Sequence, residues 1–268
     1  MAWVELIQLA CAALLVPLMP LLDGVRRKLY AVIQRRVGPP ILQTWYDLLK
    51  LFGRVTSAPA RASPLYWCGP LLAYALALLA LLMLGVPSIY QRAGGLLALL
   101  LTLEASAAAI AAGALGLSPY TSAGAARLLL LVSVADAGLL VAAVLGPSDV
   151  YSRVLLAAGL LAATLVELEL PPYNVAEAGP EIAAGPYTEY QGVSLALALW
   201  SGWLRAAALA YAAFGEVLRL NPLAALAATI AYLAVYYAVA PLFGRPRPLR
   251  AAGLAAIALV LGLVAPLL

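Results

Sequence analysis

Five glutamates and no basic residue occupy the segment VELELPPYNVAEAGPEIAAGPYTEYQG, residues 166–192, which lies between two apolar stretches. Closely spaced carboxyl groups in a poorly hydrated place share protons rather than all ionising, because burial and a neighbouring negative charge each raise the pKa of a carboxyl group. We therefore expect a proton-accepting funnel, with Glu167, Glu181 and Glu189 lining one water-accessible cavity. The acids of the funnel are Glu167, Glu169, Glu177, Glu181 and Glu189.

Three further ionisable residues lie inside apolar stretches. Glu104 and Asp136 fall near the middle of their stretches, and Arg205 falls well inside another. A charge at such depth in a bilayer costs about 2.5–3.5 kcal/mol on insertion scales, so we expect these side chains to pair, to face a polar cavity or to be neutral. We assign all three to the same proton relay as the five glutamates, and leave the part played by Glu104 open.

Each assignment has a plainer alternative. Glu177 and Glu181 are four residues apart and fit two charges on the exposed face of a helix. Glu189 fits a helix cap, because a negative charge is favourable at a helix N-terminus. Asp136 fits a structural ion pair with Arg205.

The rest of the sequence places these residues in a membrane. Of the 268 residues, 65% are hydrophobic and 10% are charged, whereas a soluble domain is about half apolar and about a quarter charged. The apolar runs are long enough for spanning helices, which predicts an all-α polytopic membrane protein with a single domain, residues 1–268. The first run follows Met1 without a basic segment or a clear cleavage site, so we expect it to be retained. The eight predicted spans are about 2–22, 65–86, 94–117, 125–146, 150–170, 190–215, 222–243 and 250–267.

Basic residues are divided unevenly between the predicted loops, which indicates the orientation. Loop 23–64 alone contains eight, namely Arg26, Arg27, Lys28, Arg35, Arg36, Lys50, Arg54 and Arg61. The same side also holds Arg245, Arg247 and Arg250. The opposite side holds only Arg92, Arg153 and Arg219. Since cytoplasmic loops carry an excess of Lys and Arg, we predict a plasma-membrane protein whose N-terminus lies outside and whose loops 23–64 and 171–189 are cytoplasmic.

Loop 23–64 has the pattern of two amphipathic helices separated by Pro39-Pro40. The stretches GVRRKLYAVIQRRVG and PPILQTWYDLLKLFGR each place apolar residues on one helical face, so we expect two interfacial helices along the membrane surface. Anchoring to lipid headgroups is an alternative, but eight cations exceed what an anchor needs, and we expect a docking surface for a partner protein. Its residues are Arg26, Arg27, Lys28, Gln34, Arg35, Arg36, Tyr46 and Lys50.

The chain lacks the usual ligands of redox groups. It has no His, and its two cysteines, Cys11 and Cys68, lie singly in apolar stretches. A metal cluster or zinc site usually needs about four soft ligands, and no phosphate-binding or dinucleotide-binding fingerprint is present. We therefore expect no cofactor, metal or catalytic residue on this chain, and redox chemistry in partner subunits. The lipid bilayer is the other expected partner, and nucleic acid is not.

Two long motifs resemble a known family. RRKLYAVIQRRVGPPILQTWYDLLKLFGR, residues 26–54, resembles the first cytoplasmic loop of the H-type membrane subunit of complex I and of its relatives in group 4 membrane-bound [NiFe] hydrogenases. The family pattern E-x-x-x-x-P-F-D-x-x-E-x-E-x-E-L-x-x-G-x-x-x-E-Y-x-G lies on this chain without a gap. The aligned residues are Glu167, Pro172, Tyr173, Asn174, Glu177, Glu181, Gly185, Glu189, Tyr190 and Gly192. A third, weaker match is GAARLLLLVSVAD, in which Gly124 and Arg127 precede Asp136 at the family spacing.

Departures from the complex I pattern favour the hydrogenase branch. Asn174 stands where complex I has Asp, Gly179 replaces a Glu, and Asp136 replaces a Glu. Gly202 stands where complex I tends to have an acid. The short Gly-Pro-Pro junction ending at Pro40 is typical of the hydrogenase branch, whereas complex I has a longer insertion there. The chain therefore looks more like a hydrogenase-type or sulfur-reducing relative, of the formate hydrogenlyase or energy-converting kind, than like a quinone reductase.

The resemblance implies a non-catalytic subunit of an oxidoreductase complex, of the hydrogenase or NADH/ferredoxin dehydrogenase type. Such a protein would dock a hydrogenase-like arm and link its redox reaction to proton or ion translocation through buried carboxyls. The implied partners are [NiFe]-hydrogenase-like large and small subunits, an iron–sulfur subunit and antiporter-like membrane subunits. Iron–sulfur clusters, and in hydrogenases a [NiFe] centre, would belong to those partners. Alternatives are the quinone-site subunit of a complex I-type oxidoreductase, a sulfur-reductase relative, a stand-alone transporter and a purely structural anchor. The terminal electron acceptor and the exported ion, H⁺ or Na⁺, stay open.

Overall fold

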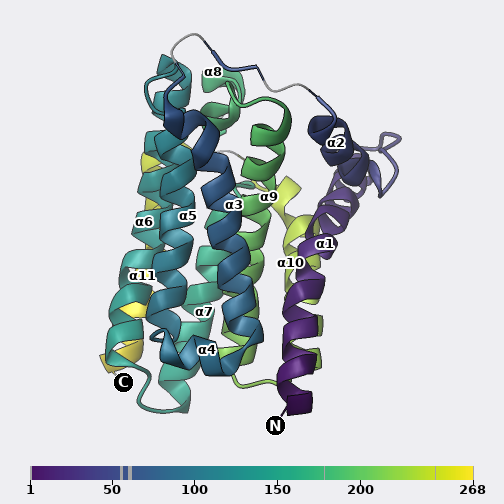
Figure 1. The fold of residues 1–268 in the computed structure, drawn as a ribbon. Helices are drawn as coiled ribbons and strands as arrows, with labels where there is room; N and C mark the ends of the chain where they lie inside the picture. Colours follow the sequence, from purple (N-terminus) through teal and green to yellow (C-terminus); the bar gives the residue numbers. More distant parts are fainter. Residues whose placement is uncertain (1, 55–56, 60–61, 178, 245, 268) are drawn as a thin grey trace.

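Eight long apolar helices form the body of the protein in the computed structural model (Figure 1), which describes residues 2–54, 57–59, 62–177, 179–244 and 246–267. Across these ranges the regular elements are all helical, so the predicted all-α polytopic fold is confirmed. Two of the predicted basic loop residues, Arg61 and Arg245, lie outside the described residues. The long helices are α1 (Ala2–Ile33), α3 (Pro64–Gly85), α5 (Leu96–Ala114), α6 (Pro119–Leu145), α7 (Val150–Glu167), α9 (Gly192–Ala212), α10 (Pro222–Val239) and α11 (Pro248–Val264).

Short helical elements connect and extend the long ones. They are α2 (Gln43–Phe52), α4 (Pro87–Arg92), α8 (Gly179–Ile182), η1 (Gly185–Tyr187), the π-helical turn η2 (Ala213–Val217), η3 (Ala240–Leu242) and η4 (Ala265–Leu267). Figure 1 shows α2 and α8 at the same end of the bundle, opposite the N-terminus. We refer to this end as the α2 end.

Proline and capping residues set where the helices begin. Prolines occupy the first turn of α3, α6, α10 and α11, where the missing backbone N–H is not needed. Ser118 caps α6, and its hydroxyl accepts a hydrogen bond from the backbone N–H of Thr121. Asp149 caps α7 in the same way through Ser152. Such caps satisfy N–H groups that a helix cannot satisfy itself.

The first span differs from the sequence prediction. The spanning part of α1, Trp3–Ile33, has 31 residues, whereas about 20 residues cross the hydrocarbon core of a bilayer. Residues 24–33, expected as a separate interfacial helix, are instead the C-terminal part of α1. Nothing in this stretch stops a helix, because it contains Arg, Lys, Leu and Ala and no proline. α1 ends shortly before Arg35, which has a φ of 54°.

The second predicted interfacial helix is present as α2, and aromatic rings attach it to the bundle. The ring centroids of Trp45 and Trp200 lie 5.5 Å apart, and those of Phe52 and Trp200 lie 6.4 Å apart. The indole N–H of Trp200 donates to the carbonyl of Val16, 3.1 Å away. Trp200 on α9 therefore joins α2 to α1.

Small residues allow the long helices to approach closely. On α6 a side chain at Gly138 would collide with the backbone carbonyl of Leu259 on α11, and a side chain at Gly262 would collide with the backbone of Gly138. Small residues at helix contacts are the usual means of packing helices in membranes. α11 packs mainly on α6 and α7, whereas α10 packs mainly on α1 and α9.

Candidate proton-relay site

A buried ion pair lies inside the bundle between α7 and α9. The Nε atom of Arg205 lies 2.7 Å from Oε2 of Glu167, and both side chains are almost completely buried. Ser201, one turn earlier on α9, accepts a hydrogen bond from Nη1 of Arg205 at 3.4 Å. The second oxygen of Glu167, Oε1, is buried and has no hydrogen-bond partner among the described residues.

Asp136 is buried on α6 and is not paired with Arg205. Its side chain is 1% exposed, and within the described part of the chain neither carboxyl oxygen has a hydrogen-bond partner. The alternative of a structural Asp136–Arg205 ion pair is therefore wrong, because Arg205 is bonded to Glu167 instead. Asp136 still lies within electrostatic range of Glu167, Glu104 and Arg205. The carboxyl thus faces charged neighbours without forming a direct bond to them.

Glu104 on α5 is the acid whose part in the relay the sequence leaves open. It is half-buried and lies within electrostatic range of Glu167 and Arg205. Because Asp136 interacts with the same two groups, the structure brings Glu104, Asp136, Glu167 and Arg205 into one cluster. They come from four different helices: α5, α6, α7 and α9.

Glu169 lies just past the end of α7 and connects this cluster to the α2 end. Its backbone is left-handed, with a φ of 50°. The Tyr187 hydroxyl donates to Oε1 at 2.6 Å, whereas the buried Oε2 has no partner among the described residues. Burial raises the pKa of Glu169 to about 8, with help from the negative charge of Glu177, although the Tyr187 hydrogen bond and Arg205 act against the rise.

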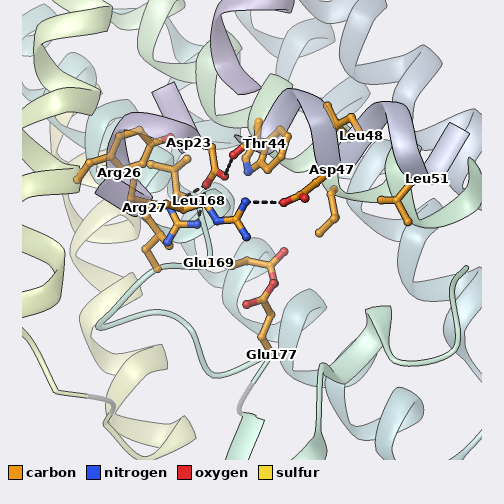
Figure 2. Close-up of a pocket in the computed structure, with 14 residues that line it drawn as sticks. Asp23, Arg26, Arg27, Thr44, Asp47, Leu48, Leu51, Leu168, Glu169 and Glu177 are labelled. Atoms are coloured by element: carbon orange, nitrogen blue, oxygen red, sulfur yellow. Dashed lines mark hydrogen bonds and ion pairs between the residues drawn. The ribbon is translucent and has the colours of Figure 1, made fainter. Parts of the chain in front are cut away.

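A cavity of about 240 Å³ opens beside Glu169 at the α2 end. Figure 2 shows the Glu169 and Glu177 carboxyl groups turned toward one another, with Arg27 and Asp47 on the other side of the space. The wall also contains apolar and aromatic residues of α9 and α10, including Trp203 and Tyr237. The cavity therefore joins the acidic loop to the end of α1 and to α2.

Ion pairs hold the α1 and α2 side of the cavity together. Arg27 lies 2.6 Å from Asp47, and Asp23 accepts hydrogen bonds from Arg26 and from the hydroxyl of Thr44, both at 2.8 Å. Partial burial would raise the pKa of Asp47, but its hydrogen bonds from Arg27 and Gln43 outweigh burial and hold that pKa below its ordinary value. Asp47 is thus held in its charged form.

The expectation that Glu167, Glu181 and Glu189 share one cavity is wrong. Glu167 faces Arg205 inside the bundle. Glu181 forms an ion pair with Arg127 at 3.0 Å, and its side chain is 57% exposed. Glu189 is half-buried before α9, where its backbone carbonyl accepts a hydrogen bond from Tyr66 at 3.1 Å. The acids of the segment that line the cavity are Glu169 and Glu177.

Arg127 and Gly124, in the motif before Asp136, contact the acidic segment directly. Arg127 bonds to Glu181 and, at 3.4 Å, to the carbonyl of Val175. A side chain at Gly124 would collide with Gly185 and Pro186. The start of α6 therefore packs against the acidic segment, and Asp136 lies further along the same helix.

The predicted docking residues divide into two groups. Arg26 and Arg27 are taken up by ion pairs with Asp23 and Asp47, and Lys28 donates to the carbonyl of Gly38 at 3.3 Å. Arg26 also lies over the ring of Tyr30, 5.2 Å from its centroid. The remaining predicted residues are exposed at the α2 end: Gln34, Arg35, Arg36, Tyr46 and Lys50.

Sequence reasoning missed Asp23, Asp47 and Tyr187. An acid shortly before RRK, and a second acid on the polar face of α2, were signals for the first two. Tyr187 lies inside the acidic segment itself, two residues before Glu189. Within the described ranges no group of three His, Cys, Asp or Glu side chains is placed to hold a metal ion.

Comparison with known proteins adds relatives over most of the chain. A family model described as NADH dehydrogenase matches residues 5–267. Hydrogenase-4 component C of Escherichia coli (strain K12) is 32% identical over 227 residues, which cover 75% of this chain and 71% of that protein. Formate hydrogenlyase subunit 4 of the same organism is 30% identical over 216 residues, covering 70% and 69%.

A solved structure shares the fold. It is a chain in the membrane-bound sulfane sulfur reductase, described as an archaeal respiratory membrane complex. The TM-score is 0.74 at 24% identity, over 98% of this chain and 99% of that chain.

Proposed function

Because the chain belongs to the NADH dehydrogenase family, we propose that it anchors the redox arm of a respiratory complex and couples the arm's reaction to proton movement. The relatives named hydrogenase-4 component C and formate hydrogenlyase subunit 4 support a place in a multi-subunit redox complex. The redox groups belong to partner subunits: a hydrogenase-like large and small subunit with iron–sulfur clusters. Antiporter-like membrane subunits would receive the protons.

One observation carries the proposal: a row of carboxyl groups leads from the α2-end cavity into the bundle, and each has a buried oxygen without a partner in the described structure. These oxygens are Oε2 of Glu169, Oε1 of Glu167 and both oxygens of Asp136. A buried polar oxygen without a hydrogen bond costs free energy, and binding a proton gives it a donor that can be passed on. The unpaired oxygens are therefore the positions at which the relay would hold protons.

Arg205 gives the row its direction. It compensates the charge of Glu167 through a direct bond, whereas Asp136 has no cation in contact within the described residues. An unpaired buried carboxylate is far costlier than a paired one. A proton from the cavity would thus pass from Glu169 to Glu167 and neutralise the Glu167 carboxylate. From there it would move to Asp136, with Glu104 as the next acceptor.

The α2 end is where we propose that the redox arm docks, on the cytoplasmic side. Arg35, Arg36 and Lys50 are exposed there, and an excess of basic residues is typical of cytoplasmic loops. The cavity with Glu169 and Glu177 lies at the same end, so a docked arm would cover its entrance. A redox reaction in the arm could then change the charge seen by Glu169.

The size of the cavity favours protons and water over an organic electron acceptor. Its volume of about 240 Å³ is below the roughly 300–1,000 Å³ of typical small-molecule sites. Its lining is rich in carboxyl and guanidinium groups, contributed by Asp23, Arg26, Arg27, Asp47, Glu169 and Glu177. Such a lining suits water and a mobile proton more than an apolar ring.

The test is Asp136→Asn in the intact complex. We expect the complex to assemble, the redox arm to keep its activity with an artificial electron donor and acceptor, and coupled ion transport into vesicles to be lost. Asp136→Glu should keep both. Ser106→Ala, which removes another buried hydrogen bond, serves as the control for packing and should keep transport. Normal transport by Asp136→Asn would overturn the proposal.

A further inference from the structure

An apolar groove outside the relay opens along the side of the bundle between α10 and α11. Its volume is about 580 Å³, and Leu165 of α7 contributes to its wall. Four aromatic rings line it: Tyr173, Tyr232, Tyr236 and Phe243. The groove exists because α10 and α11, although consecutive, pack on different partners, α10 on α1 and α9, and α11 on α6 and α7.

The groove is built of fixed side chains. The Tyr232 hydroxyl donates to the carbonyl of Leu161 at 2.6 Å, and the Tyr236 hydroxyl donates to the carbonyl of Pro171 at 3.0 Å. These bonds satisfy the hydroxyls and leave the rings to form the apolar wall. The groove is thus preformed, which lowers the entropic cost of filling it.

The length of the groove corresponds to one leaflet. Phe243 lies at the α2 end of the bundle, and Tyr232 lies eleven residues earlier in the chain, roughly 16 Å along a helix. Half of a hydrocarbon core about 30 Å thick is about 15 Å. A hydrocarbon chain that enters beside Phe243 would therefore end near Tyr232, close to the middle of the bilayer.

Two arginines follow the groove-lining residues Gly244 and Pro246 in the chain. Arg250 lies four residues before Leu254, which lines the groove, so the two share one face of α11, and Arg247 is the N-cap residue directly before that helix. Both arginines are exposed, and neither forms an ion pair within the described part of the chain. They also stand at the N-terminus of α11, where backbone N–H groups favour a negative charge.

We propose that the groove binds one anionic phospholipid, with its phosphate between Arg247 and Arg250 and a hydrocarbon chain along Val239 and Leu254. Positive charge next to an apolar, aromatic-lined groove at the membrane boundary is complementary to such a lipid. The lipid would press on Tyr236, whose hydroxyl holds the Pro171 turn two residues after Glu169. The inference does not depend on the proposed relay.

The experiment measures lipid retention by the purified complex in nanodiscs of phosphatidylcholine with added phosphatidylglycerol. We expect about one phosphatidylglycerol per chain to resist washing, with glycerol phosphate unable to displace it. The double change Arg247→Gln and Arg250→Gln should weaken retention roughly 30-fold, and Val239→Trp, which fills the groove, should abolish it. The matched control is Arg92→Gln with Arg219→Gln, which alters exposed arginines at the opposite end and should change nothing.

Three results would overturn the proposal. Equal retention of phosphatidylcholine would show that Arg247 and Arg250 do not select an anionic headgroup. Retention that survives both Val239→Trp and the double arginine change would place the lipid elsewhere. A crosslink from Phe243→Cys to a helix of a neighbouring protein in the complex would show that protein, not lipid, fills the groove.

Discussion

Arg205 and Glu167 form a direct ion pair, with 2.7 Å between Nε and Oε2, although they are 38 residues apart and lie on different helices. Both side chains are almost completely buried, and Nη2 of Arg205 has no partner among the described residues. Each member of the pair therefore compensates the buried charge of the other.

Replacing either Arg205 or Glu167 alone should destabilise the protein more than replacing both together. Glu167→Gln alone or Arg205→Met alone leaves one buried group uncompensated, and each should lower the free energy of unfolding by about 3–5 kcal/mol. The double variant Glu167→Leu with Arg205→Met should recover most of that loss. Thermal unfolding of the detergent-purified complex measures the loss in the single variants and its recovery in the double variant. If the double variant also transports ions normally, the pair is structural and not part of the relay.

Glu169 should titrate near pH 8, and its neighbours should shift that value in opposite directions. Glu177→Gln removes a neighbouring negative charge and should lower the pKa of Glu169, whereas Tyr187→Phe removes a bond to the ionised form and should raise it. The carboxylic C=O stretch in infrared difference spectra follows this titration. An unshifted titration in both variants would contradict the assignment. Glu181→Gln is the control, because that carboxyl is largely exposed.

The same carboxyl should make stability depend on pH. The folded-state pKa of about 8 exceeds the ordinary value of 4.5, so the folded protein binds more protons than the unfolded chain between these values. The stabilising contribution is therefore present below about pH 4.5 and is lost as pH rises toward 8. Glu169→Gln should flatten this fall in unfolding measurements across the range that the two values define. A slope equal to that of the wild type would count against the raised pKa.

Arg35 and Arg36 should matter for docking, whereas Arg26 and Arg27 should matter for folding. Replacing Arg35 and Arg36 together with Glu places like or unpaired charges at an interface, and the redox arm should dissociate during purification while the membrane protein stays folded. Arg92→Glu, at an exposed residue of the opposite end, is the control. A fully assembled and active complex with both changes would exclude this docking surface.

Gly24 should be required for the position of α2. A side chain there would collide with the backbone carbonyl of Ile41, in the segment that leads into α2. Gly24→Ala should therefore displace α2 and lower thermal stability. Gly253→Ala is the matched control, because no atom lies within 4 Å of the added carbon, and alanine in a helix is favoured over glycine by roughly 0.5–1 kcal/mol. Equal stability of the two variants would disprove the steric argument.

Composition and run length were sufficient to predict the eight spans, since a bilayer demands about 20 apolar residues per helix. The end of the first span was not predictable in this way. The pattern of residues 24–33 fits a separate amphipathic helix and equally fits the continuation of α1. Whether residues 24–33 form a separate helix or continue α1 depends on whether a helix-terminating residue separates them from the span. A search for apolar runs does not detect the absence of such a residue.

Residue type was sufficient to identify candidate residues for the relay. It was not sufficient to predict which carboxyl group forms the ion pair with Arg205. An arginine and an aspartate inside apolar runs suggested a bond between Arg205 and Asp136, yet Arg205 contacts Glu167. Which carboxyl meets the guanidinium depends on how α6, α7 and α9 are rotated about their axes. That rotation is a matter of tertiary packing between helices distant in the chain, of which the close approach of Gly138 on α6 to Leu259 on α11 is an example, and it is not visible in a local motif.

The continuity of α1 has a mechanical consequence. α1 is helical from the buried Leu15 to Ile33 and contains Pro17 and Pro20. A proline has no backbone N–H, so Pro20 leaves the carbonyl of Val16, four residues earlier, without its helical donor. That carbonyl accepts a hydrogen bond from Trp200 instead, so a displacement of α1 at this point would be transmitted to Trp200. Trp200 lies on the helix that carries Arg205. A partner that displaces α1 would therefore act on the helix that carries Arg205.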